Sequence, residues 1–257
     1  MSAIVEYDCI VVGAGIEGSA TAYHLAKKKQ RTLLLEQFGL PHTRGSSFGQ
    51  SRLTRFSYRQ KHYMQMMEEA FPLWSVLEKE TKTTLFRNTQ LLIIQKPPYN
   101  LLEGRKKQLM AFGKLHRELT HREVLQRCPG MRLTEDFRAL LDECAGTLKA
   151  NKALKGFQDE FKKRGGIIHD EEKVLSIIPG KIVTVCTTKN RYTSKSVVLT
   201  AGPWSSKILQ PLGLSLPLET KSPSWMYRIT YLLSWQIMEK IVFSRKFPHF
   251  LFFPLLN

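Results

Sequence analysis

Cysteine is scarce in this chain of 257 residues, and the four cysteines that occur lie far apart. They are Cys9, Cys128, Cys144 and Cys186. None forms a C-x-x-C pair and none has a histidine at metal-ligand spacing, which argues against both a disulfide framework and a zinc site. We therefore expect reduced thiols in an intracellular protein, and no bound metal.

Long apolar runs are also missing. No stretch of about 18 apolar residues, the length that crosses a bilayer, occurs in the chain. The N-terminus carries Glu6 where a secretory signal would have a basic region followed by an apolar one. We expect neither a spanning helix nor a secretory signal, and no membrane partner.

Acidic residues are few: 22 Asp and Glu stand against 39 Lys and Arg, which gives a net charge of +17 at pH 7. This charge indicates either a basic, solvated surface or attraction to anions such as nucleic acids, phosphate-bearing cofactors and carboxylate substrates. No basic stripe interleaved with aromatic residues and no nucleic-acid motif occurs, so we expect no nucleic-acid partner.

Apolar periodicity predicts alternating strands and helices, and hence an α/β fold. The chain starts with a β-turn-α-β unit made of a strand at 8–13, a helix at 16–29 and a strand at 32–36. Further helices are predicted at 62–81, 101–119, 122–127 and 150–164. Further strands are predicted at 90–95, 167–169, 173–178, 182–188, 192–193 and 196–200. Residues 222–257 are rich in Phe, Trp and Tyr and read either as a helix at 229–242 or as a substituted tail.

The turn of the β-turn-α-β unit has the sequence G-x-G-x-x-G, with glycines at 13, 15 and 18. In a dinucleotide site Gly13 allows the tight turn, Gly15 lets the backbone approach a pyrophosphate, and Gly18 lets helix and strand pack closely. Glu36 ends the second strand, where its carboxylate can accept hydrogen bonds from ribose hydroxyls. An acid there disfavours a 2′-phosphate and hence NADP, but the motif leaves FAD, NAD and a ligand-free glycine turn open.

The next segment favours FAD over NAD. A loop rich in glycine and serine is followed by Arg52 and Arg55, three residues apart. Ser46 and Ser47 can donate hydrogen bonds to a phosphate or a flavin ring, and the arginines can hold the charge of a reduced flavin or a carboxylate. The alternative is a solvated basic loop.

Four motifs in this order resemble the monomeric sarcosine oxidase family. They are the runs 10–26, 33–37, 44–52 and 200–204, and the resemblance covers about residues 7–220. It implies that Arg52 lies beside the flavin ring and that Arg55 binds the substrate carboxylate with Tyr58 nearby. It also implies that Val174 meets the adenine through its backbone, and that Gly202 lies at a strand end beside the cofactor. Together with the motif, it assigns FAD binding to these residues: Gly13, Ala14, Gly15, Ile16, Gly18, Glu36, Gln37, Ser46, Ser47, Arg52, Val174 and Gly202.

The chain departs from the family in two respects. Phe48 occupies a position where the family often has histidine. In its later part the family carries a cysteine linked to the flavin, a lysine used in oxygen activation, a second carboxylate-binding lysine and a glycine-rich segment, and none of these can be placed in 222–257. The family's C-terminal peroxisomal tripeptide is absent as well, because this chain ends in Leu-Leu-Asn257. We expect a C-terminally truncated form with little activity. The family's localisation is peroxisomal, but the last residues of this chain favour the cytosol.

These observations predict a Rossmann-type FAD-binding domain formed by 1–88 and 149–220, an inserted and incomplete α+β substrate domain at 89–148, and a divergent tail at 221–257. The resemblance implies an FAD-dependent oxidation of the C–N bond of a secondary amino acid, such as sarcosine or pipecolate, by molecular oxygen. It also implies a monomer. A non-catalytic FAD- or partner-binding fragment is a second possibility. An NAD-dependent dehydrogenase is a third, and it leaves Arg52 and Arg55 unexplained.

Overall fold

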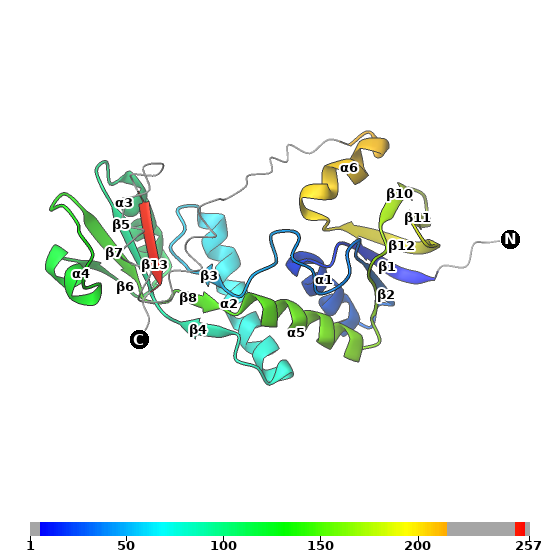
Figure 1. Ribbon diagram of the computed structural model, residues 1–257, viewed down its shortest axis with the longest axis horizontal. Coiled ribbons are helices and arrows are strands. Elements are labelled where there is room, and N and C mark those ends of the chain that lie inside the picture. The colour runs from blue at the N-terminus through cyan, green and yellow to red at the C-terminus, as the bar shows by residue number, and fades with distance from the viewer. Residues whose placement is uncertain (1–5, 215–249, 255–257) are drawn as a thin grey trace. The chain divides into compact units, whose positions relative to one another are not determined.

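The computed structural model describes residues 6–214 and 250–254 (Figure 1). The chain divides into two compact units. The first unit comprises residues 1–50 and 150–222, and the second comprises 51–149 and 223–257.

The first unit is built on a six-stranded sheet in the order β10-β11-β12-β1-β2-β9. Its strands are β1 (Tyr7–Val12), β2 (Thr32–Leu35), β9 (Ile167–His169), β10 (Val174–Ile178), β11 (Val183–Thr187) and β12 (Arg191–Leu199). Neighbouring strands from β12 through β1 and β2 to β9 run parallel, whereas β10, β11 and β12 form an antiparallel meander. The last four residues of β1 are apolar and buried, as expected of a strand covered on both faces. The α/β fold predicted from the sequence is confirmed.

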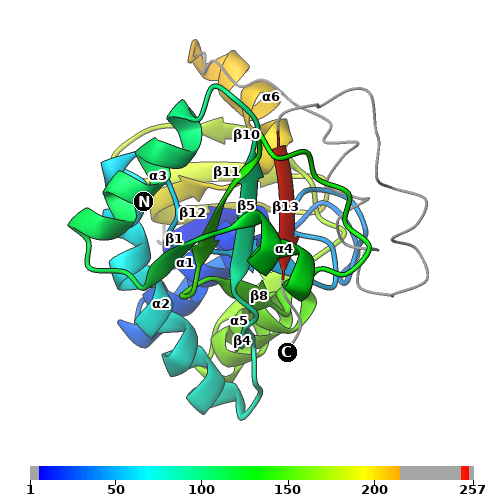
Figure 2. The same cartoon turned by 90° about the vertical axis from the view of Figure 1, so that its left-hand side faces the viewer.

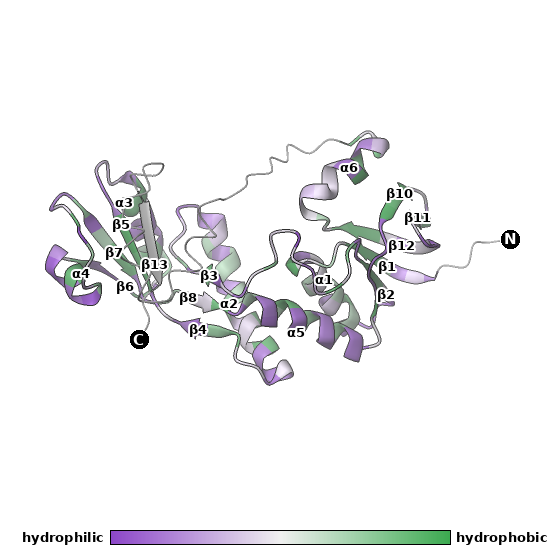
Figure 3. Ribbon diagram, viewed as in Figure 1, coloured by the Kyte–Doolittle hydropathy of each residue, from purple (hydrophilic) through white to green (hydrophobic). Residues whose placement is uncertain are grey.

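The first unit has three α-helices among its described residues. They are α1 (Ile16–Lys27), α5 (Ala150–Lys163) and α6 (Ser205–Leu209). Short 3-10 helices flank α6 at Gly202–Trp204 and Gln210–Leu212. Helices α1 and α5 lie side by side (Figure 1), and the rings of Tyr23 and Phe157 meet between them with centroids 5.3 Å apart. Helix α5 buries its apolar residues at helical spacing, and its hydrophilic residues show as purple bands (Figure 3).

The second unit contains two antiparallel sheets. One has four strands in the order β13-β5-β7-β6, and β13 lies beside β5 (Figure 2). The other has three strands in the order β3-β8-β4. The strands are β3 (Arg52–Thr54), β4 (Phe86–Asn88), β5 (Leu91–Gln95), β6 (His116–Leu119), β7 (Arg138–Asp142), β8 (Gly146–Leu148) and β13 (Phe250–Pro254). The helices are α2 (Lys61–Thr81), α3 (Asn100–Ala111) and α4 (His121–Arg127).

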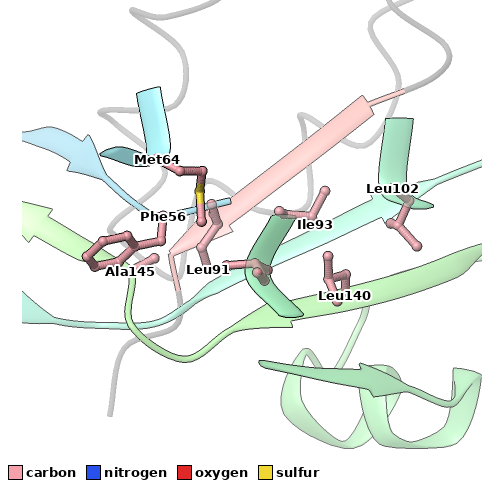
Figure 4. Close-up of a cluster of buried hydrophobic side chains, with 8 residues drawn as sticks. Phe56, Met64, Leu91, Ile93, Leu102, Leu140 and Ala145 are labelled. Carbon is pink, nitrogen blue, oxygen red and sulfur yellow. The ribbon is translucent and has the colours of Figure 1, made fainter. Parts of the chain in front are cut away.

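The core of the second unit joins helices and strands that are distant in sequence. Met64 of α2, Leu91 and Ile93 of β5, Leu102 of α3 and Leu140 of β7 pack in one buried cluster (Figure 4). Phe56, Leu109 and Ala145 complete it.

This cluster changes the domain boundary that the sequence predicted at residue 88. The strand β3 pairs with β8, and Phe56 and Met64 pack into the second unit's core. Residues 51–88 therefore belong to the second unit, because apolar side chains of this stretch pack into its core.

One predicted helix is wrong in its second half. The helix expected at 101–119 ends at Ala111, and β6 follows at His116–Leu119. Gly113 has a φ of +60°, and its N–H bonds back to the carbonyl of Met110, which ends the helix. The residues beyond then pair with β7 and become a strand. The helix considered at 229–242 lies outside the described residues.

Among the helices of residues 6–214, none combines the length and the apolar character that a membrane span requires.

Candidate functional site

The turn between β1 and α1 is closed by two glycines that no other residue can replace without a clash. Gly13 has a φ of +103°, and a Cβ there would lie 2.6 Å from the carbonyl oxygen of Thr200. A Cβ on Gly18 would lie 1.8 Å from the carbonyl oxygen of Gly13. The start of α1 is therefore held directly against the ends of β1 and β12, as the glycine motif predicts at these two positions.

Gly15 differs from its two neighbours in the motif. Its backbone is extended, and among the described residues a Cβ there would meet the side chain of Ser47, with the hydroxyl at 3.0 Å. The same hydroxyl accepts a hydrogen bond from the backbone N–H of Ile16 at 2.9 Å. A side-chain oxygen thus occupies the N-terminus of a helix of 12 residues, where free N–H groups and the positive end of the helix dipole favour a phosphate oxygen.

Glu36 is a buried carboxylate at the carboxyl end of β2. Its side chain accepts hydrogen bonds from the backbone N–H of Ala14 at 2.8 Å and of Phe38 at 3.0 Å. Nε2 of His42 lies 3.6 Å from the same carboxylate. Because β1 and β2 are parallel neighbours, Glu36 and the glycine turn meet at one edge of the sheet, which is where open α/β sheets bind their ligands.

A shallow, open pocket of about 430 Å³ is formed mainly by the residues that follow Glu36 in the chain. It is lined by residues 37–39, 41–44 and 171. Phe38 organises one wall: its ring centroid lies 5.5 Å from that of Trp204 and 5.2 Å from that of His42, and the guanidinium of Arg44 lies 4.6 Å above it. Of these residues Gln37 was predicted from the sequence, whereas Phe38, His42 and Arg44 were not. The only local signal for them is their place just after the second strand.

Three further residues of the first unit were predicted to bind the cofactor, and the structure places each of them in a different element. Gly202 follows β12 with a φ of +51°. Val174 starts β10 and packs against the sheet core, and two residues before it Glu172 donates its N–H to the carbonyl of Glu36 at 2.8 Å. Ser46 is exposed in the loop before β3.

The three predicted catalytic residues all belong to the second unit. Arg52 lies in β3 and donates from Nη1 to the carbonyl of Ser51 at 2.8 Å. Arg55 and Tyr58 lie together, with the Arg55 guanidinium carbon 4.7 Å from the centre of the Tyr58 ring. This cation–π contact orients the Arg55 guanidinium.

The start of α1 and Glu36, both in the first unit, have the chemistry that a dinucleotide site needs. The N–H groups at the start of α1, one of which now donates to the hydroxyl of Ser47, suit a pyrophosphate. The buried carboxylate of Glu36 retains lone pairs for ribose hydroxyls. Within the described ranges, no cluster of three or more His, Cys, Asp or Glu residues could hold a metal ion.

Comparison with known proteins places these features in context. Residues 8–251 match the sequence model of a family described as FAD dependent oxidoreductase. The peroxisomal sarcosine oxidase of Homo sapiens is 47% identical over 83% of this chain and 55% of its own length, and that of Mus musculus is 46% identical over the same shares. NikD, an unusual amino acid oxidase essential for nikkomycin biosynthesis, superposes in its open form with a TM-score of 0.76 at 26% identity, covering 83% of this chain and 56% of NikD. The chain spans about half the length of the curated relatives it matches.

Proposed function

We propose, from the premise that this chain belongs to the FAD-dependent oxidoreductase family, that it binds FAD and takes part in oxidising the C–N bond of a secondary amino acid. The observation that carries the proposal is the glycine turn with the N–H of Ile16 and the buried carboxylate of Glu36 at one sheet edge. FAD is the cofactor of this family.

The residues of the first unit would hold the ADP half of the cofactor. The pyrophosphate would receive hydrogen bonds from the start of α1 at Gly15 and Ile16, with Ser46 and Ser47 beside it. Glu36 would accept from the ribose hydroxyls, and Ala14, whose N–H already binds that carboxylate, holds it in place. Gln37 and Val174 would flank the adenine, while Gly202 would lie beside the cofactor where β12 ends.

The residues of the second unit would act on the flavin ring and the substrate. Bound FAD would supply the redox chemistry: the C–N unit would lose two electrons and two protons to become an imine, and oxygen would gain two electrons and two protons to become hydrogen peroxide. By the resemblance, Arg52 lies beside the flavin ring and Arg55 binds the substrate carboxylate. Tyr58 orients Arg55 through its ring.

The partners that follow from this function are a small amino acid and molecular oxygen. The two mammalian relatives carry peroxisomal names, and other relatives are named monomeric sarcosine oxidases, as in Bacillus. We propose that this chain is likewise a monomer.

An anaerobic mixing experiment tests the oxidase. The purified chain loaded with FAD is mixed with sarcosine or L-pipecolate, and the visible absorbance of the flavin is followed before air and a peroxide-coupled assay are applied. We expect slow bleaching with at least one amino acid, since Arg55 supplies one side of the carboxylate clamp. If FAD binds but neither amino acid bleaches its visible absorbance, the result would instead support a non-catalytic FAD-binding chain.

The Gly15→Val variant tests the cofactor site itself. A branched side chain would occupy the space through which the backbone approaches the pyrophosphate, and hydrogen bonds to a charged group contribute about 1.5–3 kcal/mol each. We expect FAD affinity to fall by at least about 100-fold in a flavin-fluorescence titration. Gly104→Val, in helix α3 of the second unit, is the matched control, because an added Cβ there would lie 3.5 Å from its nearest described neighbour, the side chain of Arg59. Equal affinity of the two variants would contradict the proposed site.

A further inference from the structure

The main chain of Glu36 is held on both sides by one region of the first unit. Its N–H donates to the carbonyl oxygen of His169 at 2.9 Å, and its carbonyl oxygen accepts the N–H of Glu172 at 2.8 Å. His169 ends β9, and Glu172 lies in the turn that leads to β10. The direction in which a side chain leaves the backbone follows from the main chain, so the aim of the Glu36 carboxylate depends on this turn.

The turn carries three acids in succession, at residues 170–172, and the first two contact the loop that lines the pocket. Asp170 accepts the backbone N–H of Leu40 through Oδ2 at 2.7 Å. A Cβ on Gly39 would lie 3.3 Å from Oε1 of Glu171, so the Glu171 side chain lies against the same loop, and it also lines the pocket. The turn and the loop after β2 therefore form one connected structure.

The third acid, Glu172, has its side chain inside the unit. It is 3% exposed, and its Oε1 accepts a hydrogen bond from the hydroxyl of Thr187, the last residue of β11, at 2.5 Å. Nδ1 of His169 lies 3.4 Å from its other oxygen. A buried carboxylate is costly unless it is hydrogen-bonded, so these contacts fix where the Glu172 side chain can lie.

A tyrosine extends this anchor to a third strand. The hydroxyl oxygen of Tyr192, in β12, lies 2.9 Å from Nδ1 of His169 and accepts a hydrogen bond from Nδ2 of Asn190 at 3.1 Å. The pKa of Tyr192 is raised to about 12, first by burial; the hydrogen bond from Asn190 opposes the shift, and the Glu172 carboxylate adds to it. The hydroxyl therefore stays protonated, and the Glu172 side chain is tied to β9, β11 and β12.

The turn needs such an anchor because its backbone is strained. Glu171 has a φ of +52°, in the left-handed region that residues other than glycine rarely adopt. A residue in this region keeps its conformation only where the surrounding contacts impose it. Without the side-chain anchor of Glu172, the turn would relax and the main chain of Glu36 would lose its fixed neighbour.

We propose that Glu172 is a positioning residue for Glu36 and, through it, for the ribose of the cofactor. The Glu172 side chain anchors the turn, the Glu172 N–H fixes the Glu36 main chain, and the Glu36 carboxylate is thereby aimed at the ribose hydroxyls. The inference rests on the proposed function for the ribose contact. It assigns to Glu172 a role in recognition as well as in stability.

The test compares two ligands that differ in the ribose hydroxyls, ADP and 2′,3′-dideoxy-ADP. Their affinities for the full 257-residue chain are measured by calorimetry. We expect the unmodified chain to prefer ADP at least about tenfold, as hydrogen bonds to a charged acceptor imply. Glu172→Ala should reduce this preference to about twofold or less, whereas Glu172→Gln, which retains an acceptor oxygen for Thr187, should keep most of it.

Glu160→Ala is the matched control, because Glu160 is also a buried carboxylate of the first unit, 4% exposed and paired with Arg164 at 2.5 Å. It should keep the preference for ADP even where it lowers stability. A second readout needs no ligand: the N–H of Ala14, which donates to the Glu36 carboxylate, is followed by hydrogen exchange in nuclear magnetic resonance spectra. We expect it to exchange at least about tenfold faster in Glu172→Ala than in Glu160→Ala.

The outcomes separate this inference from the proposed function. A Glu172→Ala variant that is folded by circular dichroism yet keeps the ADP preference, or whose Ala14 N–H exchanges no faster than in Glu160→Ala, would overturn the inference. So would an equal loss of the preference in Glu160→Ala. Equal affinities of the unmodified chain for the two ligands would contradict the proposed function, while faster exchange of Ala14 in Glu172→Ala would still support Glu172 as the residue that positions Glu36.

Discussion

Replacing Gly18 with alanine is expected to prevent the first unit from folding. The added Cβ would lie 1.8 Å from the carbonyl oxygen of Gly13 and 2.6 Å from Oγ1 of Thr200. The oxygen of Gly13 is a backbone atom of the tight turn itself, so it cannot move aside as a flexible side chain would. We expect a loss of more than about 4 kcal/mol in the free energy of unfolding, beyond the range of ordinary substitutions.

The matched variant is Gly15→Ala, three residues earlier in the same turn. Among the described residues its Cβ would meet the side chain of Ser47, whose hydroxyl, 3.0 Å away, can shift. Soluble yield and urea unfolding followed by far-ultraviolet circular dichroism measure both. A Gly18→Ala protein as stable as Gly15→Ala would mean that the helix and the turn are not packed as described.

Replacing Asp142 with alanine is expected to destabilise the second unit by roughly 3–5 kcal/mol. The change leaves the backbone N–H groups of Phe56, Ser57 and Cys144 without their acceptor, and each unsatisfied buried donor costs about 1–3 kcal/mol. Two of these donors are deeply buried, so water cannot replace the lost carboxylate at little cost.

Asp142→Asn is the control for this prediction. It removes the charge but retains one oxygen of similar position, so it should lose less than half as much stability as alanine. Chemical denaturation of both variants gives the comparison. If alanine and asparagine are equally tolerated, the carboxylate does not organise the segment that carries Arg55.

Local pattern explains most of the elements that the sequence predicted. The unit formed by β1, α1 and β2 matches its predicted ranges within two residues, because buried parallel strands are continuously apolar and the glycines mark the turn between them. The strands β7 and β8 were missed, since neither shows an alternating pattern between clear turn signals. Their strand form comes from pairing with β5, β6, β3 and β4.

Part of the candidate site was equally visible in the sequence, and part was not. Gly13, Gly18 and Glu36 were named because each follows a strand or opens a helix at a recognisable spacing. Asp142 was not, since the backbone groups it binds at Phe56 and Ser57 lie 86 and 85 residues away in the chain. No local pattern reports such a contact.

The sequence by itself therefore determined the glycine turn, the acid at the end of the second strand and the family to which they belong, because those features depend on neighbours within one β-α-β unit. Only the tertiary structure decided that residues 51–88 join the second unit and that the turn carrying Glu172 lies against Glu36. The physical reason is the same in both cases. Apolar burial and backbone hydrogen bonding are satisfied by whichever distant segment fits, and charges on those segments are then brought together by the packing and not by their order in the chain.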